Sequence, residues 1–338
     1  MNIGISLLGF GNVNRTLVKL IKERNNLIDD DAIKVISVVD KKFGSLYSPA
    51  GIQLDELLDL DGKEGCLSTI ADGKSSFIPE LCWECPEVSV MCEAIFTNPK
   101  DGEPALSYCR QALESGVHVC TTNKGPVAFA LKELESIAAQ KQCEFLYEGS
   151  VMSGTPVLSL KQYGLPANKI SRFEGLLNGT ANFVLSEVEA GASFSQAIKH
   201  AQELGYAEAN PQADIEGSDV HLKVMILVQS LLELGVEKQD ISCEGIENLS
   251  EEDVRQAVTE GYHWKLVGRG ELLPNGKISA SVKAQKLPIS HPLATVSGAT
   301  NALYIKDQML DGIMIQGPGA GRVETAYALL SDLLRISH

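Results

Sequence analysis

The stretch MNIGISLLGFGNVN, residues 1–14, decides how the first half of the chain folds. Its apolar start up to Leu8 predicts a buried strand, and the apolar spacing that continues to Ile21 predicts a helix. Between them, Gly9 and Gly11 predict a tight turn whose backbone can approach a pyrophosphate closely. The helix begins at this turn and offers its free N–H groups to the anion. The stretch therefore predicts a strand, a phosphate-binding turn and a helix.

A second apolar run, residues 33–39, ends at Asp40 and completes a βαβ unit. An acid at this point accepts a hydrogen bond from the ribose 2′-hydroxyl of NAD and repels the 2′-phosphate of NADP. Lys41 and Lys42 favour NADP, because an ammonium group can pair with that phosphate. We therefore expect use of both nucleotides, with a mild preference for NADP. The position of a usual third glycine holds Asn14, a departure that bears on cofactor affinity rather than on the fold.

The alternation of strands and helices continues to about residue 150. Strands are expected at 88–96, 117–122 and 144–147, and helices at 105–115 and 131–140. Two of the strands end in polar turns, at Thr97-Asn98 and at Asn123-Lys124. Ligands of such sheets gather at the strand ends, so Lys124 is expected in a loop where nicotinamide and substrate meet, although a solvated lysine fits the pattern equally. The fold class is α/β, with a Rossmann-type dinucleotide-binding domain over residues 1–150.

Length and composition indicate a two-domain enzyme with small-molecule ligands. The chain has 338 residues, 44% of them hydrophobic, and a formal net charge of −15 that argues against nucleic-acid and membrane partners. No long apolar run or signal-like start is present, so a cytoplasmic location is expected. The eight cysteines are scattered, as expected for reduced thiols, and Cys82-Trp83-Glu84-Cys85 lacks the second pair of a structural zinc site.

From about residue 151 to 317 the pattern is that of a second, α+β domain. Strands are expected at 170–175, 278–283, 302–305 and 312–315, helices at 183–189 and 194–204, and a hairpin turn at Pro274-Asn275-Gly276. The glycine-rich segment 317–321 suits close backbone approach. The last helix, 324–335, is expected to return to the first domain with residues 318–338.

Residues 205–223 gather several acids and a lysine just before a long apolar helix. Gly217 and Ser218 predict the helix start, so Asp219 and Lys223 lie four residues apart on one face. Such a pair is common on solvated helix faces, where it contributes only a few tenths of a kcal/mol. The clustering with further acids favours a catalytic site over this alternative.

Seven segments, taken in order, resemble homoserine dehydrogenase. They are residues 9–13, 122–124, 148–156, 177–182, 203–223, 291–294 and 317–326. The resemblance implies a reversible, NAD(P)-linked interconversion of L-homoserine and L-aspartate 4-semialdehyde, in the biosynthesis of threonine, methionine and isoleucine. It also implies a catalytic second domain whose sheet forms a homodimer. The chain is similar to a short form of the family, without a C-terminal amino-acid-sensing domain.

The resemblance implies a role for each site residue. Lys223 is the general acid–base for the substrate hydroxyl, Lys124 is a second lysine near the nicotinamide and an alternative proton shuttle, and Asp219 orients the reacting end. The implied substrate contacts are Glu208, Asp214, Gly179, Thr180 and Tyr206. The implied cofactor contacts are Gly9, Gly11, Asn12, Val13, Asp40, Lys41, Thr97, Asn98, Lys124 and Gly321.

Residues 148–155 resemble the family's loop for a monovalent cation. The implied ligands are Glu148, Val151, Ser153 and Thr155, and their oxygen atoms suit Na⁺. The alternative for this segment is a Gly-Thr-Pro turn with Glu148 at the surface.

Two other functions compete with homoserine dehydrogenase. One is a same-fold NAD(P) oxidoreductase that acts on another amino or hydroxy acid. The other is a catalytically silent dinucleotide-binding sensor. The sensor is disfavoured, because binding alone does not need both Lys124 and Lys223 together with three acids.

Overall fold

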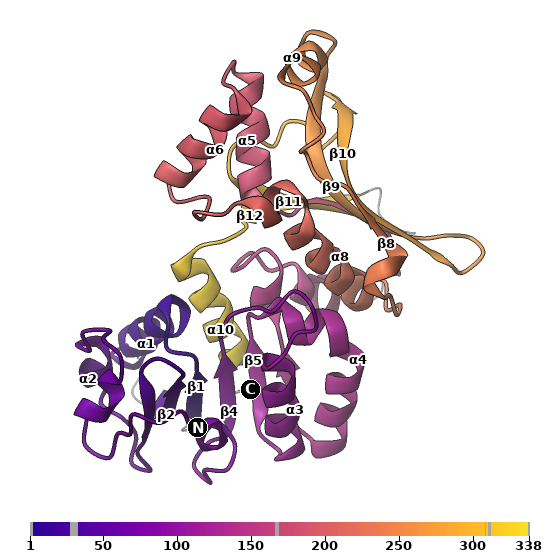
Figure 1. Ribbon diagram of the computed structural model, residues 1–338. Coiled ribbons are helices and arrows are strands. Elements are labelled where there is room, and N and C mark those ends of the chain that lie inside the picture. Colours follow the sequence, from indigo (N-terminus) through magenta and orange to yellow (C-terminus); the bar gives the residue numbers. More distant parts are fainter. Residues whose placement is uncertain (1–2, 28–32, 166–168, 308, 310–311, 337–338) are drawn as a thin grey trace. The chain divides into compact units, whose positions relative to one another are not determined.

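The computed structural model describes residues 3–27, 33–165, 169–307, 309 and 312–336. The chain forms two compact units, each with a six-stranded sheet (Figure 1). Unit 1 comprises residues 1–154 and 321–338, and unit 2 comprises residues 155–320. These limits lie a few residues beyond the division expected from the sequence. The expected α/β class, a Rossmann-type domain followed by an α+β domain, is confirmed.

Unit 1 has the strand order β3-β2-β1-β4-β5-β6. All neighbours are parallel except β2 and β3. The order reverses between β1 and β4, and the carboxyl ends of strands at such a switch point form the ligand crevice of this fold. The elements are β1 (Ile3–Leu8), α1 (Asn12–Asn25), β2 (Ile33–Asp40), β3 (Gly44–Tyr47), α2 (Leu54–Leu58), β4 (Val90–Glu93), α3 (Ala105–Glu114), β5 (His118–Thr121), α4 (Lys124–Lys141), β6 (Phe145–Leu146) and α10 (Arg322–Ile336).

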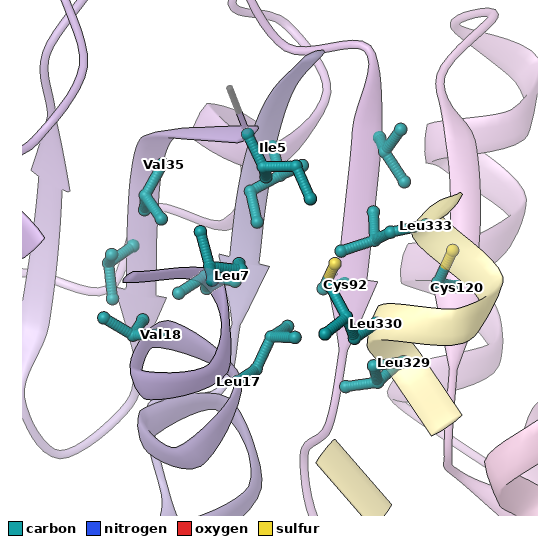
Figure 2. Close-up of a cluster of buried hydrophobic side chains, with 14 of the residues drawn as sticks. Ile5, Leu7, Leu17, Val18, Val35, Cys92, Cys120, Leu329, Leu330 and Leu333 are labelled. Carbon is teal, nitrogen blue, oxygen red and sulfur yellow. The ribbon is translucent and has the colours of Figure 1, made fainter. Parts of the chain in front are cut away.

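The core of unit 1 joins the first and last parts of the chain. Leu17 of α1 and Leu329 and Leu333 of α10 pack with Leu7 of β1 and Cys92 of β4 in one buried cluster (Figure 2). Burying each such leucine contributes about 1.5–3 kcal/mol, so α10 is held firmly on the sheet. The C-terminal helix therefore belongs to the same unit as the phosphate-binding turn.

Asn14, which replaces the third glycine, is completely buried. Its Nδ2 donates to the carbonyl of Gly9 at 2.7 Å and lies 3.4 Å from that of Leu8 and 3.3 Å from that of Cys92. The amide thus ties the ends of β1 and β4 to the turn that precedes α1. The asparagine that stands in place of glycine therefore has a structural role at the predicted phosphate-binding turn.

Helix α4 begins at Lys124, earlier than the expected start at Leu131. Ala130 leaves helical geometry (φ −144°, ψ 25°), so the expected helix is only the second part of a kinked one. Asn123 caps the first part by accepting a hydrogen bond from the N–H of Gly125 at 3.0 Å. Pro126 fits in this first turn because its missing N–H would have no helical partner there. The expected loop at Lys124 is therefore wrong: this lysine lies on the first turn of a helix.

Unit 2 has the strand order β12-β11-β7-β9-β10-β8, antiparallel except for β8 with β10. Helix α8 packs on β9 and β10, and α5 packs on β9 and β11. The sequence predicted the turn between β9 and β10 but not β9, β8 or α9. The elements are β7 (Ile170–Leu176), α5 (Gly179–Glu189), α6 (Phe194–Glu203), α7 (Gln212–Ile215), α8 (Ser218–Leu231), β8 (Ile241–Cys243), α9 (Glu251–Thr259), β9 (Tyr262–Leu272), β10 (Ile278–Pro288), β11 (Thr300–Asp307) and β12 (Ile313–Pro318).

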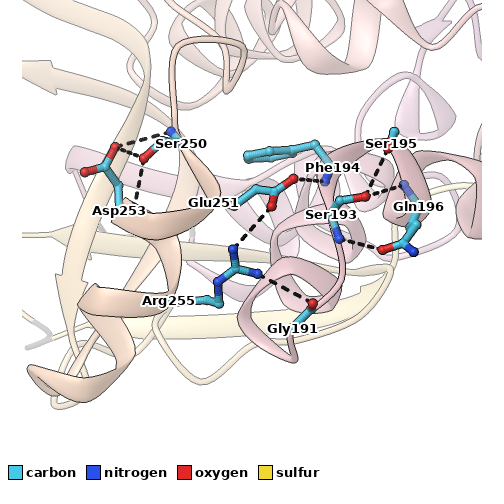
Figure 3. Close-up of polar contacts among 9 residues, drawn as sticks. All are labelled: Gly191, Ser193, Phe194, Ser195, Gln196, Ser250, Glu251, Asp253 and Arg255. Atoms are coloured by element: carbon cyan, nitrogen blue, oxygen red, sulfur yellow. Dashed lines mark hydrogen bonds and ion pairs between the residues drawn. The ribbon is translucent and has the colours of Figure 1, made fainter.

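Two α-helices of unit 2 start with capping boxes (Figure 3). Ser193 and Gln196 form the box of α6, and Ser250 and Asp253 form that of α9. Glu251, in the first turn of α9, accepts a hydrogen bond from the first N–H of α6 at 3.0 Å. The two helix starts are therefore linked and define one end of the unit.

The part of the chain that the structure describes contains no helix that is long and apolar enough to cross a membrane. All eight cysteines are free, and Cys82 and Cys85 are both buried. Burial raises the pKa of each of these two thiols, which disfavours the thiolate that metal binding or redox chemistry needs. Within the described residues, no group of three His, Cys, Asp or Glu could hold a metal ion.

Candidate active site

A polar cluster in unit 2 is built around Asn178, the N-cap of α5. Its Oδ1 accepts a hydrogen bond from the N–H of Ala181 at 2.8 Å, as an N-cap does. Its Nδ2 donates to Asp214 Oδ1 at 2.6 Å and to Asp219 Oδ2 at 3.0 Å. One amide therefore holds two carboxylates together at the start of a helix.

Lys223 completes this cluster. Its Nζ donates to Asp219 Oδ2 at 2.8 Å and to the carbonyl of Leu177 at 2.6 Å. The side chain is only 9% exposed, whereas a solvated helix pair would leave it in water. The structure thus excludes the ordinary surface pair and places a lysine, two aspartates and an asparagine in direct contact.

Burial raises the pKa of the Asp214 carboxyl, and the nearby charge of Asp219 raises it further. The hydrogen bond from Asn178 opposes this rise, because it stabilises the ionised form. Asp214 therefore takes up a proton at a higher pH than an ordinary aspartate. A carboxyl group that changes charge beside a lysine is typical of a functional site.

The predicted substrate contacts differ in their setting. Thr180 is buried in the first turn of α5 and donates to the carbonyl of Tyr206 at 2.7 Å, which joins the α5 start to the loop after α6. Gly179 lies so close to the carbonyl of Ala299 that a Cβ would approach it to 2.6 Å. Tyr206 is 49% exposed, and Glu208 is also exposed. Within the described part of the chain, no hydrogen bond or ion pair joins the Glu208 carboxylate to the cluster.

Asn178 belongs to this cluster, although no role was expected for it from the sequence. It lies inside residues 177–182, one of the segments that resemble the family. An asparagine directly before Gly-Thr at the start of a helix is a recognisable N-cap signal. Its second function, bridging Asp214 and Asp219, depends on residues 36 and 41 positions away and has no local signal.

In unit 1, the turn between β1 and α1 fits a dinucleotide. Gly9 has a φ of +84°, and a Cβ there would meet the carbonyl of Ala94 at 2.9 Å, so glycine is required. Gly11, the N-cap of α1, is exposed and has open space where a Cβ would be. Asn12 and Val13 follow in the first turn, where the free N–H groups of the helix favour an anion.

Asp40 is bound mainly to the backbone. Its Oδ2 accepts a hydrogen bond from the N–H of Phe10 at 2.7 Å, and its Oδ1 accepts from the N–H groups of Lys42 and Phe43 at 2.8 and 3.1 Å. The carboxylate therefore fixes the phosphate-binding turn to the loop after β2. Lys41 is exposed, and the ammonium of Lys42 lies 5.1 Å from the centre of the Phe43 ring.

The other predicted cofactor residues lie at the ends of β4 and β5 and before α10. Thr97 and Asn98 follow β4, and the Asn98 amide donates to Asp101 Oδ1 at 2.7 Å and to the Glu103 carbonyl at 3.0 Å. Lys124 follows β5 as the first residue of α4. Gly321 precedes α10 with a φ of +141°.

The predicted cation loop contains a buried acid rather than a surface one. Glu148 is 6% exposed, its N–H donates to Asp332 Oδ2 at 3.0 Å, and its Oε2 lies 4.0 Å from Nη1 of Arg335. The alternative with Glu148 at the surface is therefore wrong. Val151 is fully buried, and Ser153 Oγ is 2.7 Å from Thr325 Oγ1. Thr155 is the first residue of unit 2 and donates to the Pro318 carbonyl at 3.1 Å.

A phosphate-binding turn at a sheet switch point and a buried acid–lysine cluster define a two-domain dinucleotide-dependent oxidoreductase. Comparison with known proteins gives the family. A family model described as homoserine dehydrogenase matches residues 156–334. The NAD(+)-dependent homoserine dehydrogenase of Pseudomonas canavaninivorans is 45% identical over 335 residues, which covers 98% of this chain and 95% of that protein. The homoserine dehydrogenase of Sulfurisphaera tokodaii is 33% identical, with 97% and 96% covered.

Solved structures agree with this result. A putative homoserine dehydrogenase from Archaeoglobus fulgidus aligns with a TM-score of 0.85 at 29% identity, over 99% of both chains. A hyperthermophilic archaeal homoserine dehydrogenase in complex with NADPH aligns with a TM-score of 0.83 at 28% identity, over 100% of this chain and 98% of that one. The chain therefore belongs to the homoserine dehydrogenase family, and it is an NAD(P)-using oxidoreductase.

Proposed function

We propose that the cluster of Asn178, Asp214, Asp219 and Lys223 is the site at which this protein interconverts L-homoserine and L-aspartate 4-semialdehyde. The observation that carries the proposal is the buried Lys223, fixed by Asp219 and the Leu177 carbonyl. Among the described residues, these two contacts use two of the three N–H donors of the ammonium group. The third donor can serve a substrate oxygen.

The proposed reaction needs one proton transfer beside the hydride transfer. In homoserine oxidation, neutral Lys223 takes the hydroxyl proton while the carbon that bears the hydroxyl loses a hydride and becomes an aldehyde carbon. A nicotinamide held near Thr97, Asn98 and Lys124 would supply the acceptor for this hydride. In the reverse direction, the ammonium of Lys223 returns the proton to the aldehyde oxygen, and Asp219 keeps the side chain in place. Asp214 and Glu208 supply carboxylates for the substrate ammonium, and Thr180, Gly179 and Tyr206 shape the surroundings.

The activity is tested with purified protein, L-homoserine and NAD⁺ or NADP⁺, by following the absorbance of the reduced cofactor. L-serine and L-threonine are matched controls, since each is an amino acid with a hydroxyl group. Reduction with homoserine alone supports the proposal. Reduction with one of the controls and not with homoserine would favour the same-fold oxidoreductase with another substrate, and binding of nucleotide without any reduction would favour the sensor.

We also propose that both nucleotides are used, with a mild preference for NADP that depends on Lys41 and Lys42. Three backbone N–H groups hold the Asp40 carboxylate in place. Its negative charge disfavours a 2′-phosphate, whereas the ammonium groups of the two lysines attract one. The relative from P. canavaninivorans is named NAD(+)-dependent, and one structural neighbour binds NADPH. Similar proteins therefore include one named for NAD⁺ and one that binds NADPH.

Replacing Lys41 and Lys42 together by alanine is expected to shift the ratio of kcat/KM values towards NAD by about ten- to a hundredfold, the worth of a charge-assisted contact. Asp40→Ala is expected to shift the ratio towards NADP. The control is Lys19→Ala, an exposed lysine of α1. An unchanged NADP affinity in the double variant would leave Asp40 as the main determinant.

We propose that Glu148, Val151, Ser153 and Thr155 hold a sodium ion. The support from the structure is electrostatic, because the buried acids Glu148 and Asp332 share the guanidinium of Arg335, and an added cation would balance the second acid. Burial raises the pKa of Asp332 to about 7, and Glu148 contributes to this rise.

Exchanging Na⁺ for choline at constant ionic strength is expected to lower the melting temperature of the protein. Glu148→Gln should abolish this response, and an unaltered melting temperature in choline would contradict the site.

Finally, we propose that two copies pair through the sheet of unit 2. Support comes from the edge strand β12, which carries apolar side chains on both of its faces. Ile313 and Ile315 are partly exposed, and Met314 is exposed. Sedimentation equilibrium is expected to give twice the mass of one chain. A monomer at micromolar concentration would overturn this assignment.

A further inference from the structure

Glu93, the last residue of β4, is a fully buried acid with no role in the reaction described above. Its Oε1 accepts hydrogen bonds from the N–H of Ile95 at 2.8 Å and from Asn123 Nδ2 at 3.2 Å. Its Oε2 accepts from Thr121 Oγ1 at 2.5 Å. The Thr121 oxygen in turn accepts from the N–H of Asn123 at 2.9 Å, which leaves its hydrogen for Glu93. Glu93 therefore accepts a hydrogen bond in all three contacts. Burial raises the pKa of this carboxyl, and the hydrogen bonds from Thr121, Ile95 and Asn123 oppose the rise because they stabilise the ionised form.

The network determines where α4 begins. Asn123 uses its Nδ2 for Glu93 and its Oδ1 for the N–H of Gly125, so its side chain is held at both ends. Lys124 lies between Asn123 and Gly125 in the chain. The position of its backbone therefore depends on the hydrogen bond between Asn123 and the Glu93 carboxylate.

The same carboxylate determines the course of the chain after β4. The bond to the N–H of Ile95 turns the segment that leads to Thr97 and Asn98. This segment then returns to α4, where a Cβ on Gly125 would approach Gly102 Cα to 2.7 Å. The segments that carry the predicted cofactor residues Thr97, Asn98 and Lys124 are therefore both bonded to one buried acid beside the β1/β4 switch point.

We propose that Glu93 is a positioning residue for the dehydrogenase reaction, which fixes the Lys124 turn and favours the oxidised, cationic nicotinamide over the reduced one. The inference rests on the proposed function, since it presumes a nicotinamide at the carboxyl ends of β4 and β5. A negative charge in a poorly solvated place stabilises a nearby positive charge. The oxidised ring carries one positive charge and the reduced ring is neutral, so the carboxylate discriminates between them.

The test uses Glu93→Gln, which keeps the size of the side chain and removes the charge. Its amide oxygen can still accept from Ile95 and Asn123, and its NH₂ group can face the rotatable Thr121 hydroxyl. Dissociation constants of the oxidised and reduced nucleotides are measured at pH 8, by fluorescence of the reduced form and by competition with the oxidised form. The ratio of the oxidised to the reduced constant is expected to rise about three- to tenfold, the effect of one partly screened charge. Glu144→Gln is the control, because Glu144 is an exposed acid just before β6, an edge strand two places from β4.

Glu93→Asp provides an independent measurement, since it keeps the charge but its shorter side chain cannot reach all three donors. We expect a nearly unchanged ratio of dissociation constants and a lowered kcat with homoserine. A wild-type ratio in Glu93→Gln, or an equal rise in Glu144→Gln, would overturn the proposal. Wild-type protein that binds neither nucleotide would instead contradict the proposed function itself.

Discussion

Lys223→Met is expected to lower kcat for homoserine oxidation by about 10²- to 10⁴-fold, because proton transfer by a positioned side chain has an effect of this size. Nucleotide binding should persist, since the dinucleotide turn belongs to unit 1 and Lys223 to unit 2. Methionine has a similar length and fills the buried space, although it leaves Asp219 without its ammonium partner. Steady-state kinetics and nucleotide titration of the same preparation give both quantities.

Lys161→Met is the matched control for this variant. Lys161 also lies in unit 2, bonds a backbone carbonyl, that of Ser230, at 3.1 Å, and forms an ion pair with Glu233. Its loss should leave kcat within about twofold of wild type, as for other partly exposed ion pairs. A retained kcat in Lys223→Met together with an inactive Lys124→Met would move the proton shuttle to Lys124.

Asn178→Ala is expected to lower kcat/KM for homoserine by about ten- to a hundredfold. The change removes two charge-assisted hydrogen bonds, to Asp214 and Asp219, each of which contributes about 1.5–3 kcal/mol. It also removes the N-cap of α5, which costs about 1 kcal/mol of stability. Ser193→Ala, which removes the N-cap of α6 in the same unit, controls for the loss of a cap alone.

The pH dependence of the Asn178 variant gives a second criterion. Asp214 must be ionised to bind a substrate ammonium, so kcat/KM falls as the pH drops through the pKa of its carboxyl. Burial and Asp219 already raise this pKa, and the Asn178 amide lowers it. Without the amide, the acidic limb of the profile is expected to move to higher pH. A limb at the wild-type position would show that Asp214 does not titrate with substrate binding.

The dinucleotide turn could be predicted because its determinants are local. A short apolar strand, Gly9, Gly11 and an amphipathic helix follow one another without interruption, and the next strand ends in an acid. Each of these signals is read within one turn or strand. The role of Asn14 could not be predicted, because its amide contacts carbonyls at the ends of two strands, one of them 78 positions away.

The helical position of Lys124 was missed for a different reason. Glycine and proline after a lysine are typical of a loop, and the kink at Ala130 hides the continuity of the helix. The cap that starts this helix depends on Asn123 and on the buried Glu93 from another strand. Local propensity was therefore overridden by a tertiary contact.

In the proposed catalytic cluster, helical spacing predicted the Asp219–Lys223 pair, and the pair is present. Spacing could not distinguish a solvated pair from a buried one. The difference is made by the Leu177 carbonyl and Asn178, which lie between the end of β7 and the start of α5. Burial by a distant segment is a property of the fold rather than of the local sequence.

The most direct test of Lys223 as the proton shuttle is chemical rescue of Lys223→Ala by a small primary amine. With homoserine and nucleotide at saturation, the account predicts a rate that rises with methylamine concentration and follows the neutral amine as the pH is varied. Lys124→Ala, measured in parallel, should not respond to the amine. Rescue of Lys124→Ala and not of Lys223→Ala would contradict the account.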